Sequence, residues 1–95
     1  MVNGGIIMKR SENFLLQDVA GTLVVVPVGE AAVAFKGMIT MNATGAYIWE
    51  QLENEQTEQS LTDALVSHYE VDEETARADV EAFLGKLREV GALVQ

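Results

Sequence analysis

Short apolar runs bounded by turn residues fill the first half of the chain. Residues 14–19 read FLLQDV and residues 22–28 read TLVVVPV, with Ala20 and Gly21 between them. Two β-rich runs joined by such a short turn predict an antiparallel hairpin. Pro27 has no backbone N–H to donate to a neighbouring strand, so the second strand should end there or lie on the edge of the sheet.

A third strand is expected after a longer link. The link, residues 29–37, reads GEAAVAFKG, and its alanines and acidic residue suit a single helical turn over residues 29–35. Lys36 and Gly37 should end that turn. The following MITM, residues 38–41, is short and apolar, and we interpret it as the third strand.

Apolar residues recur at helical spacing in three later segments. We expect Asn42 to cap the turn from the third strand into the first helix, with Thr44 near the N-cap of that helix. The second helix should begin near Thr57, whose hydroxyl can cap it, and the third should begin after Asp72. Gly91 should end the third helix. The apolar stripes of these helices, in order, are Ile48, Trp49 and Leu52; Leu61, Ala64, Leu65 and Tyr69; and Ala76, Val80, Phe83, Leu84, Leu87 and Val90.

This order of elements indicates an α+β fold, with a three-stranded antiparallel sheet followed by three helices. The chain has 95 residues, of which 48% are hydrophobic and 22% charged, and its mean hydropathy is +0.12. A chain of this size has room for one hydrophobic core. We therefore expect one domain over residues 14–95, preceded by a flexible tail over residues 1–13.

The charge balance and the absence of cysteine exclude several classes of function. The formal net charge of −9 and the pI near 4.3 would repel the phosphate backbone of a nucleic acid. Without cysteine the chain has neither disulfides nor thiolate chemistry, which fits a reducing compartment. No apolar run is long enough to span a membrane, and the N-terminus lacks the features of a secretory signal. We expect a cytoplasmic protein.

Residues that commonly carry chemistry are few. His68 is the single histidine and has no partner at metal-ligand spacing, so we interpret it as a structural residue. The acidic run over residues 70–74 lacks the pattern of a calcium loop and is typical of a solvated helix start. No serine lies in a nucleophile motif, and the glycines lack the spacing of a phosphate-binding loop. We predict that the protein is not an enzyme and takes neither a metal nor another cofactor.

One edge of the predicted sheet is a candidate binding surface. An exposed sheet edge promotes unwanted association unless it is covered or used. In strand addition, an extended peptide pairs with such an edge through main-chain hydrogen bonds, and pockets beside the edge select its side chains. Met38, Ile39 and Met41 can serve such an edge, or they can simply be core residues beneath the helices.

Two motifs resemble those of a known family. One is Met41-Asn42-x-Thr44-Gly45-Ala46-x-Ile48-Trp49, which is followed by Thr57, Leu61 and Leu65. The other is Asp79-Val80-x-x-Phe83-Leu84-x-x-Leu87-x-x-x-Gly91-x-Leu93. In this order, over roughly residues 14–94, they resemble the PqqD-like family. That family includes the small protein D of PQQ synthesis and the peptide-recognition proteins of lasso-peptide pathways, together called RiPP recognition elements.

The resemblance implies a winged-helix-like fold and a function in peptide recognition. Such a protein is not a catalyst: it binds the leader segment of a ribosomally made precursor peptide and presents that peptide to a modifying enzyme, often a radical SAM protein. The leader lies as an added strand against the third strand, in the groove between that strand and the third helix. The residues that the resemblance implies for peptide binding are Met38, Ile39, Thr40, Met41, Asp79, Val80, Phe83, Leu84, Lys86 and Leu87.

Two departures from the family pattern limit what the resemblance implies. The link over residues 29–37 is longer than the usual direct turn, and residues 53–56, ENEQ, replace the aspartate-glycine that commonly precedes the threonine. The broad family therefore follows, whereas a specific role in PQQ synthesis does not. Lys86 and Arg88 could pair with acidic residues of a leader peptide.

Two other functions stay open from the sequence. A winged-helix DNA-binding protein would share the fold, but it would need a basic recognition helix. The last helix instead mixes charges of both signs, from Arg77, Lys86, Arg88, Asp79, Glu81 and Glu89. A purely structural or dimerising subunit would bury the same sheet edge against a second copy. We expect either a monomer or a dimer formed by strand swapping.

Overall fold

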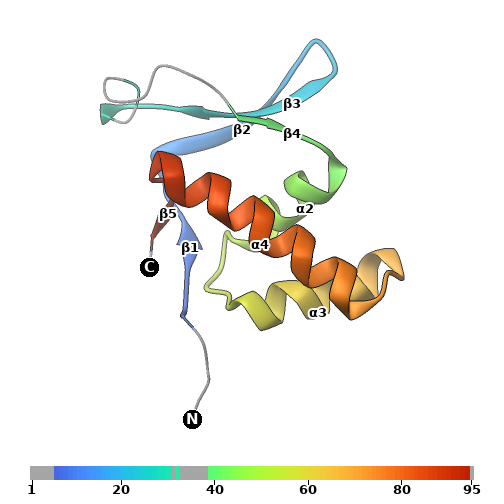
Figure 1. The fold of residues 1–95 in the computed structure, drawn as a ribbon. Helices are drawn as coiled ribbons and strands as arrows, with labels where there is room; N and C mark the ends of the chain where they lie inside the picture. The colour runs from blue at the N-terminus through green and yellow to red at the C-terminus, as the bar shows by residue number, and fades with distance from the viewer. Residues whose placement is uncertain (1–5, 31, 33–38, 95) are drawn as a thin grey trace.

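A computed structural model of the chain describes residues 6–30, 32 and 39–94. It confirms the predicted α+β class, because an antiparallel sheet of three strands is followed by three helices that lie on one of its faces (Figure 1). The elements in chain order are β1 (Lys9–Arg10), β2 (Phe14–Val19), β3 (Thr22–Pro27), β4 (Ile39–Met41), α2 (Ala43–Gln51), α3 (Glu58–Tyr69), α4 (Glu73–Val90) and β5 (Leu93–Val94).

The predicted hairpin is formed by β2 and β3, which pair along their full length. Its two turn residues, Ala20 and Gly21, both have positive φ, 54° and 87°, as the twist of a two-residue hairpin loop requires. The Asp18 carboxylate accepts a hydrogen bond of 2.8 Å from the Gly21 N–H and holds the turn. β3 ends at Pro27, as the missing N–H of proline predicted.

β4 forms one edge of the sheet. It pairs antiparallel with β3, and in the described part of the chain it pairs with no other strand. Along the strand, Ile39 is half-buried, Thr40 is exposed and Met41 is buried. Met38 and most of the predicted helical turn over 29–35 lie outside the described residues.

Asn42 caps the first helix, α2. Its side-chain oxygen accepts a hydrogen bond of 2.8 Å from the Gly45 N–H, so the helix begins at Ala43. The cap is therefore Asn42, as predicted for this turn, and Thr44, expected near the N-cap, is the second residue of the helix. An asparagine that directly follows the strand supplies an acceptor to the first helical turn at least as well as a threonine further on.

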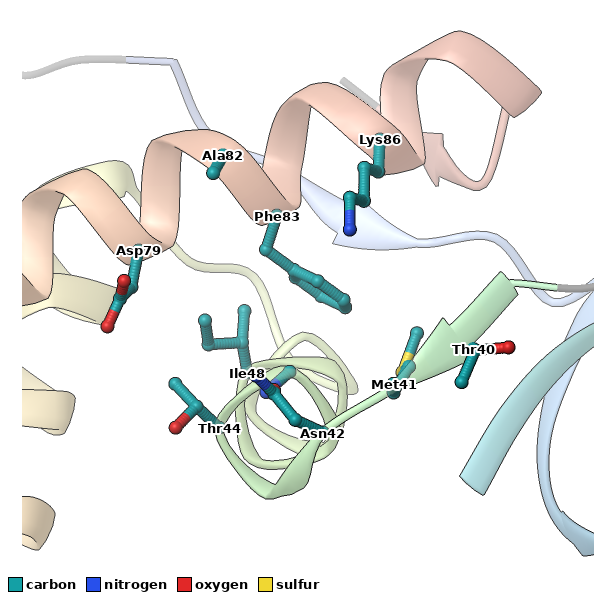
Figure 2. A pocket seen from close by; sticks show the side chains of 10 residues that line it. Thr40, Met41, Asn42, Thr44, Ile48, Asp79, Ala82, Phe83 and Lys86 are labelled. Carbon is teal, nitrogen blue, oxygen red and sulfur yellow. The ribbon is translucent and has the colours of Figure 1, made fainter. Parts of the chain in front are cut away.

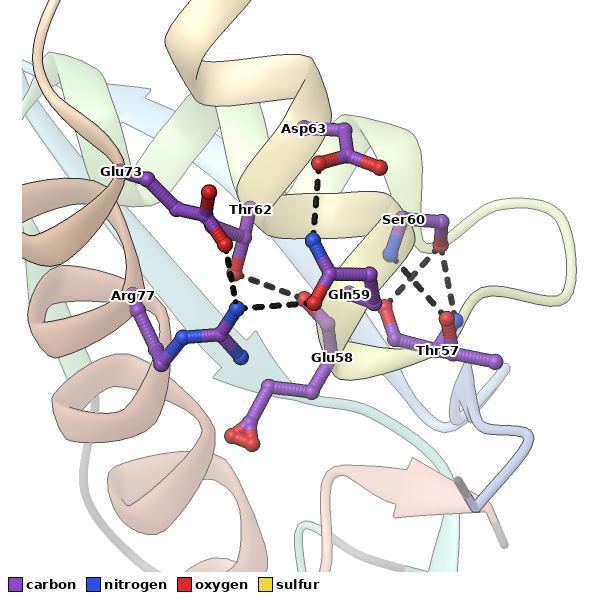
Figure 3. Close-up of polar contacts among 8 residues, drawn as sticks. All are labelled: Thr57, Glu58, Gln59, Ser60, Thr62, Asp63, Glu73 and Arg77. Carbon is purple, nitrogen blue, oxygen red and sulfur yellow. Dashed lines mark hydrogen bonds and ion pairs between the residues drawn. The ribbon is translucent and has the colours of Figure 1, made fainter. Parts of the chain in front are cut away.

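The other two helices begin where the sequence predicted. The Thr57 hydroxyl accepts a hydrogen bond of 3.0 Å from the Ser60 N–H, and the Ser60 hydroxyl accepts one of 2.8 Å from the Thr57 N–H (Figure 3). This reciprocal capping box starts α3. Asp72 is the N-cap residue of α4, and Gly91, at a φ of 75°, ends that helix.

The hydrophobic core lies between the sheet and the helices. Each helix contributes most of its predicted stripe, but Tyr69 is 37% exposed and, like Ala64, is not part of the core cluster. Trp49, only 1% exposed, is one of the largest fully buried side chains. The core cluster consists of Met8, Phe14, Val25, Met41, Ile48, Trp49, Leu52, Leu61, Leu65, Ala76, Val80, Phe83, Leu84, Leu87 and Ala92. No helix in the described ranges is long and apolar enough to cross a membrane.

The expected flexible tail over residues 1–13 is wrong for residues 8–13. Met8 is 2% exposed, and its backbone exchanges two hydrogen bonds of 2.8 Å with Gln56. β1 then pairs antiparallel with β5 in a small second sheet (Figure 1). Arg10 donates a hydrogen bond of 3.1 Å to the Trp49 carbonyl, and its guanidinium carbon lies 5.6 Å from the centre of the Trp49 ring. This segment is part of the folded domain.

Candidate functional site

A groove of about 370 Å³ opens between β4, the start of α2 and one face of α4 (Figure 2). β4 supplies one side, α4 supplies the other, and the first turn of α2 closes the bottom. The groove is lined by Thr40, Met41, Asn42, Thr44, Gly45, Ile48, Asp79, Ala82, Phe83 and Lys86. It therefore lies directly beside the edge of β4 that faces away from β3, which has no partner strand among the described residues.

The bottom of the groove is apolar and tightly packed. The Phe83 ring points from α4 toward α2, and the side chain is 8% exposed (Figure 2). A Cβ atom placed on Gly45 would lie 3.1 Å from Cε1 of that ring. Glycine at this position therefore lets the ring settle against the backbone of α2. Ile48 and Met41, both buried, complete the apolar surface around the ring.

The α4 side of the groove is a stripe of three exposed residues. Asp79, Ala82 and Lys86 follow one another at spacings of three and four residues, which places them on one face of the helix. Neither charged side chain of the stripe forms an ion pair or a side-chain hydrogen bond with the described residues. Both charges are thus available to a molecule in the groove.

The structure brings together half of the residues that the resemblance implied for peptide binding. Five of them line the groove: Thr40, Met41, Asp79, Phe83 and Lys86. Ile39 is half-buried on β4 and packs against the core. Three others are fully buried and belong to the core rather than to the groove: Val80, Leu84 and Leu87. Arg88 is exposed but does not line the groove.

The sequence prediction missed five residues that line the groove. They are Asn42, Thr44, Gly45, Ile48 and Ala82. Four of these belong to the Asn-x-Thr-Gly motif and the helix after it. The sequence therefore identified them as part of the family motif, but it did not show that they line the groove. Ala82 gave no chemical signal, but it lies on the same helical face as Asp79 and Lys86.

Polar side chains also join α3 to α4 outside the core, and their role is structural. Arg77 on α4 donates hydrogen bonds of 2.7 Å to both Gln59 on α3 and Glu73 one turn earlier (Figure 3). Burial, a hydrogen bond with Glu81 and repulsion from the same residue raise the pKa of the Glu58 carboxyl above its ordinary value, against the opposing effect of Arg77 and Arg88. None of these residues lines the groove.

The described residues offer little else for chemistry. No group of three His, Cys, Asp or Glu side chains in the described ranges is placed to hold a metal ion. A second hollow, of about 520 Å³, lies beside β1 and β2, and its lining includes the ion pair of Arg10 and Glu53, whose charged atoms are 3.3 Å apart. His68 stacks on Tyr47 with ring centres 4.2 Å apart, which supports a structural role for it.

Comparison with known proteins decides the family. The family model described as Coenzyme PQQ synthesis protein D (PqqD) matches residues 15–93. The chain belongs to the PqqD family. The match begins in β2 and ends in β5, so it includes every element that lines the groove, and it confirms the resemblance found in the two sequence motifs.

A solved structure shares the PqqD-family fold seen here. It is described as "TbiB1 in Complex with the TbiA(beta) Leader Peptide". The two chains are 24% identical, the similarity covers 90% of this chain and 93% of that chain, and the TM-score is 0.68. At this identity the similarity shows a common fold. No curated protein matches the chain.

Proposed function

We propose that this PqqD-family protein binds the leader segment of a ribosomally made precursor peptide and presents it to a modifying enzyme. The leader pairs with the free edge of β4 as an added strand, and its side chains enter the groove beside α4. The protein itself is not a catalyst in this proposal. The enzyme that acts on the bound peptide, a radical SAM protein or another modifying enzyme, is a separate partner.

The observation that carries this proposal is the position of the groove beside the outer edge of β4, a strand that in the described part of the chain pairs with β3 alone. A sheet edge presents backbone N–H and C=O groups that an extended peptide can satisfy, and the groove supplies pockets for alternate side chains. The groove is already formed in the free protein, so the ordering cost of binding falls mainly on the peptide. Family membership and the common fold with a protein solved in complex with a leader peptide support the same function.

Ala82 offers a clean test of this proposal. Its side chain is exposed on α4, so replacing it by tryptophan fills the groove without disturbing the core. Ala78, also exposed and one turn earlier, lines a different hollow with Glu74 and Arg77, and Ala78→Trp is the matched control. Ile39→Asp is less informative, because Ile39 packs against the core and its replacement would also destabilise the fold.

The assay uses synthetic peptides obtained by selecting a displayed library of short random sequences on the wild-type protein. Isothermal titration should show that Ala82→Trp weakens binding at least tenfold whereas Ala78→Trp leaves it unchanged, with circular dichroism confirming that both variants fold. Alternate amides of an added strand point toward the sheet edge. N-methylation of one alternate set of peptide amides should therefore abolish binding, and N-methylation of the other set should be tolerated. Equal binding to wild type and Ala82→Trp would reject the groove as the peptide site.

A further inference from the structure

The two ends of the groove carry opposite charges. Lys86 and Thr40 lie at one end, and Asp79 and Thr44 lie at the other (Figure 2). Asp79 and Lys86 are seven residues apart on α4, which corresponds to about 10.5 Å along the helix axis. Both are exposed, and neither is paired with a described side chain. A bound peptide would therefore meet a negative charge at one end and a positive charge at the other.

The surface between the two charges is apolar. Ala82, the smallest side chain of the α4 stripe, lies between Asp79 and Lys86, and the Phe83 ring lies below it (Figure 2). The small side chain leaves space above the ring that an apolar side chain of the peptide can occupy. Along the groove the order of surfaces is thus negative, apolar and positive.

Strand geometry converts this order into a sequence pattern. Side chains of an extended peptide alternate between its two faces, so only every second residue points into the groove. Three such residues, at positions i, i+2 and i+4, cover about 13 Å. The two charges are about 10.5 Å apart along α4, so the first and last peptide side chains reach them by leaning slightly toward each other.

The direction of β4 fixes the order of the pattern along the peptide. β4 runs from the Lys86 end of the groove toward the Asp79 end, as the positions of Thr40 and Met41 on the strand show (Figure 2). Antiparallel strand pairs are two to three times more common than parallel ones. A peptide added antiparallel to β4 runs from the Asp79 end to the Lys86 end, so its first inward residue faces Asp79.

We propose that the groove selects peptides that carry a basic residue, an apolar residue two positions later and an acidic residue two positions after that. Asp79 recognises the basic residue, the space above Phe83 holds the apolar residue, and Lys86 recognises the acidic one. This inference rests on the proposed function, and it specifies which leader segments the groove prefers. Exposed ion pairs are weak, so each correct charge should improve affinity by no more than about fivefold.

The test compares two selections from one displayed library of short random peptides. One selection uses the wild-type protein, and the other uses the double variant Asp79→Lys with Lys86→Asp, which exchanges the charges. In both, peptides that also bind a protein carrying Ala82→Trp are removed, so that only groove binders remain. Wild-type binders should be enriched in the order basic, apolar, acidic at alternate positions, and binders of the double variant should show the reversed charge order.

A matched control uses charges outside the groove. Exchanging Lys9 and Glu89, which are both exposed and line no part of the groove, should leave the selected pattern unchanged. Titration of a synthetic wild-type binder should show affinity falling by about fivefold to twenty-fivefold on the charge-exchanged double variant, and added salt should reduce that difference.

Each outcome separates this inference from the proposed function. Groove binders without a charge pattern, with the reversed order on the wild-type protein, or with the same order on both proteins would overturn the inference and leave peptide binding intact. If every binder of the wild-type protein is removed because it also binds the Ala82→Trp protein, the proposed function is overturned, and the inference with it.

Discussion

Replacing Gly45 by alanine tests how the bottom of the groove is built. The added methyl carbon would lie 3.1 Å from Cε1 and 3.3 Å from Cδ1 of the Phe83 ring, and 3.3 Å from Oδ1 of Asn42. These distances are shorter than ordinary van der Waals contacts, so the ring must move by a few tenths of an ångström. One side of the ring faces the open groove, and movement in that direction is the easiest.

The size of the effect follows from two opposing contributions. Alanine is favoured over glycine in a helix by up to about 1 kcal/mol. Forcing an aromatic side chain away from its preferred rotamer costs about 0.5 to 1.5 kcal/mol. The two nearly cancel, so Gly45→Ala should change the free energy of unfolding by no more than about 0.5 kcal/mol. Peptide binding should nevertheless weaken, because the displaced ring occupies part of the groove.

Gly85, in the middle of α4, provides the matched control. A Cβ atom on Gly85 meets nothing within 4 Å, so Gly85→Ala should stabilise the protein by about 0.5 to 1 kcal/mol and leave peptide binding unchanged. Urea denaturation of both variants measures stability, and titration with a library-selected peptide measures binding. If Gly45→Ala stabilises the protein as much as Gly85→Ala and binds peptide normally, then Phe83 does not depend on glycine at this position.

Two further predictions concern stability. Burial and Glu81 raise the pKa of the Glu58 carboxyl above its ordinary value of 4.5, so the folded protein holds this proton to a higher pH than the unfolded chain does. The protonated carboxyl therefore stabilises the fold at low pH, and this stabilisation is lost as the pH rises through the folded pKa. Glu81→Gln should therefore stabilise the protein against urea at neutral pH but not near pH 4; an equal gain at both would contradict this. Met8→Ala should lower the free energy of unfolding by about 2 to 5 kcal/mol. Ile7→Ala, at an exposed position, should not, and equal effects of the two would place Met8 outside the core.

Elements whose signals lie close together in the sequence were predictable. The hairpin turn, the Thr57 cap and the glycine that ends α4 each depend on backbone angles or hydrogen bonds within three or four residues. Such interactions form whatever the rest of the chain does, so a local pattern is sufficient to find them. The first turn of α2 was placed less well because Asn42 and Thr44 can both act as caps, and only the end of β4 selects between them.

The pairing of the two chain ends was not predictable. β1 and β5 contain two residues each, and their partners are separated by more than eighty positions in the sequence. Runs this short carry no alternating pattern. The burial of Met8 depends on Gln56 and on the core beneath it, and the sequence around Met8 indicates neither.

The candidate site was predicted in outline and misplaced in detail. Periodicity identified the apolar face of α4 but could not show how much of it the sheet and the other helices cover. Val80, Leu84 and Leu87 lie at the covered centre of that face, whereas Phe83 lies at its border and reaches the groove. The exposed stripe beside it includes Ala82, whose importance is the space it leaves. A single sequence does not show where a small side chain such as Ala82 leaves empty space on the surface.

The small sheet of β1 and β5 has a consequence for engineering. The two strands are antiparallel neighbours, with Lys9 opposite Val94, so the described chain enters and leaves the domain at one place. Neighbouring strands lie about 4.8 Å apart, a distance that a single loop position of another protein can bridge. No groove residue comes from either strand. The domain can therefore be spliced into an exposed loop of a modifying enzyme, which would couple recognition and catalysis in one polypeptide while the groove stays open to solvent.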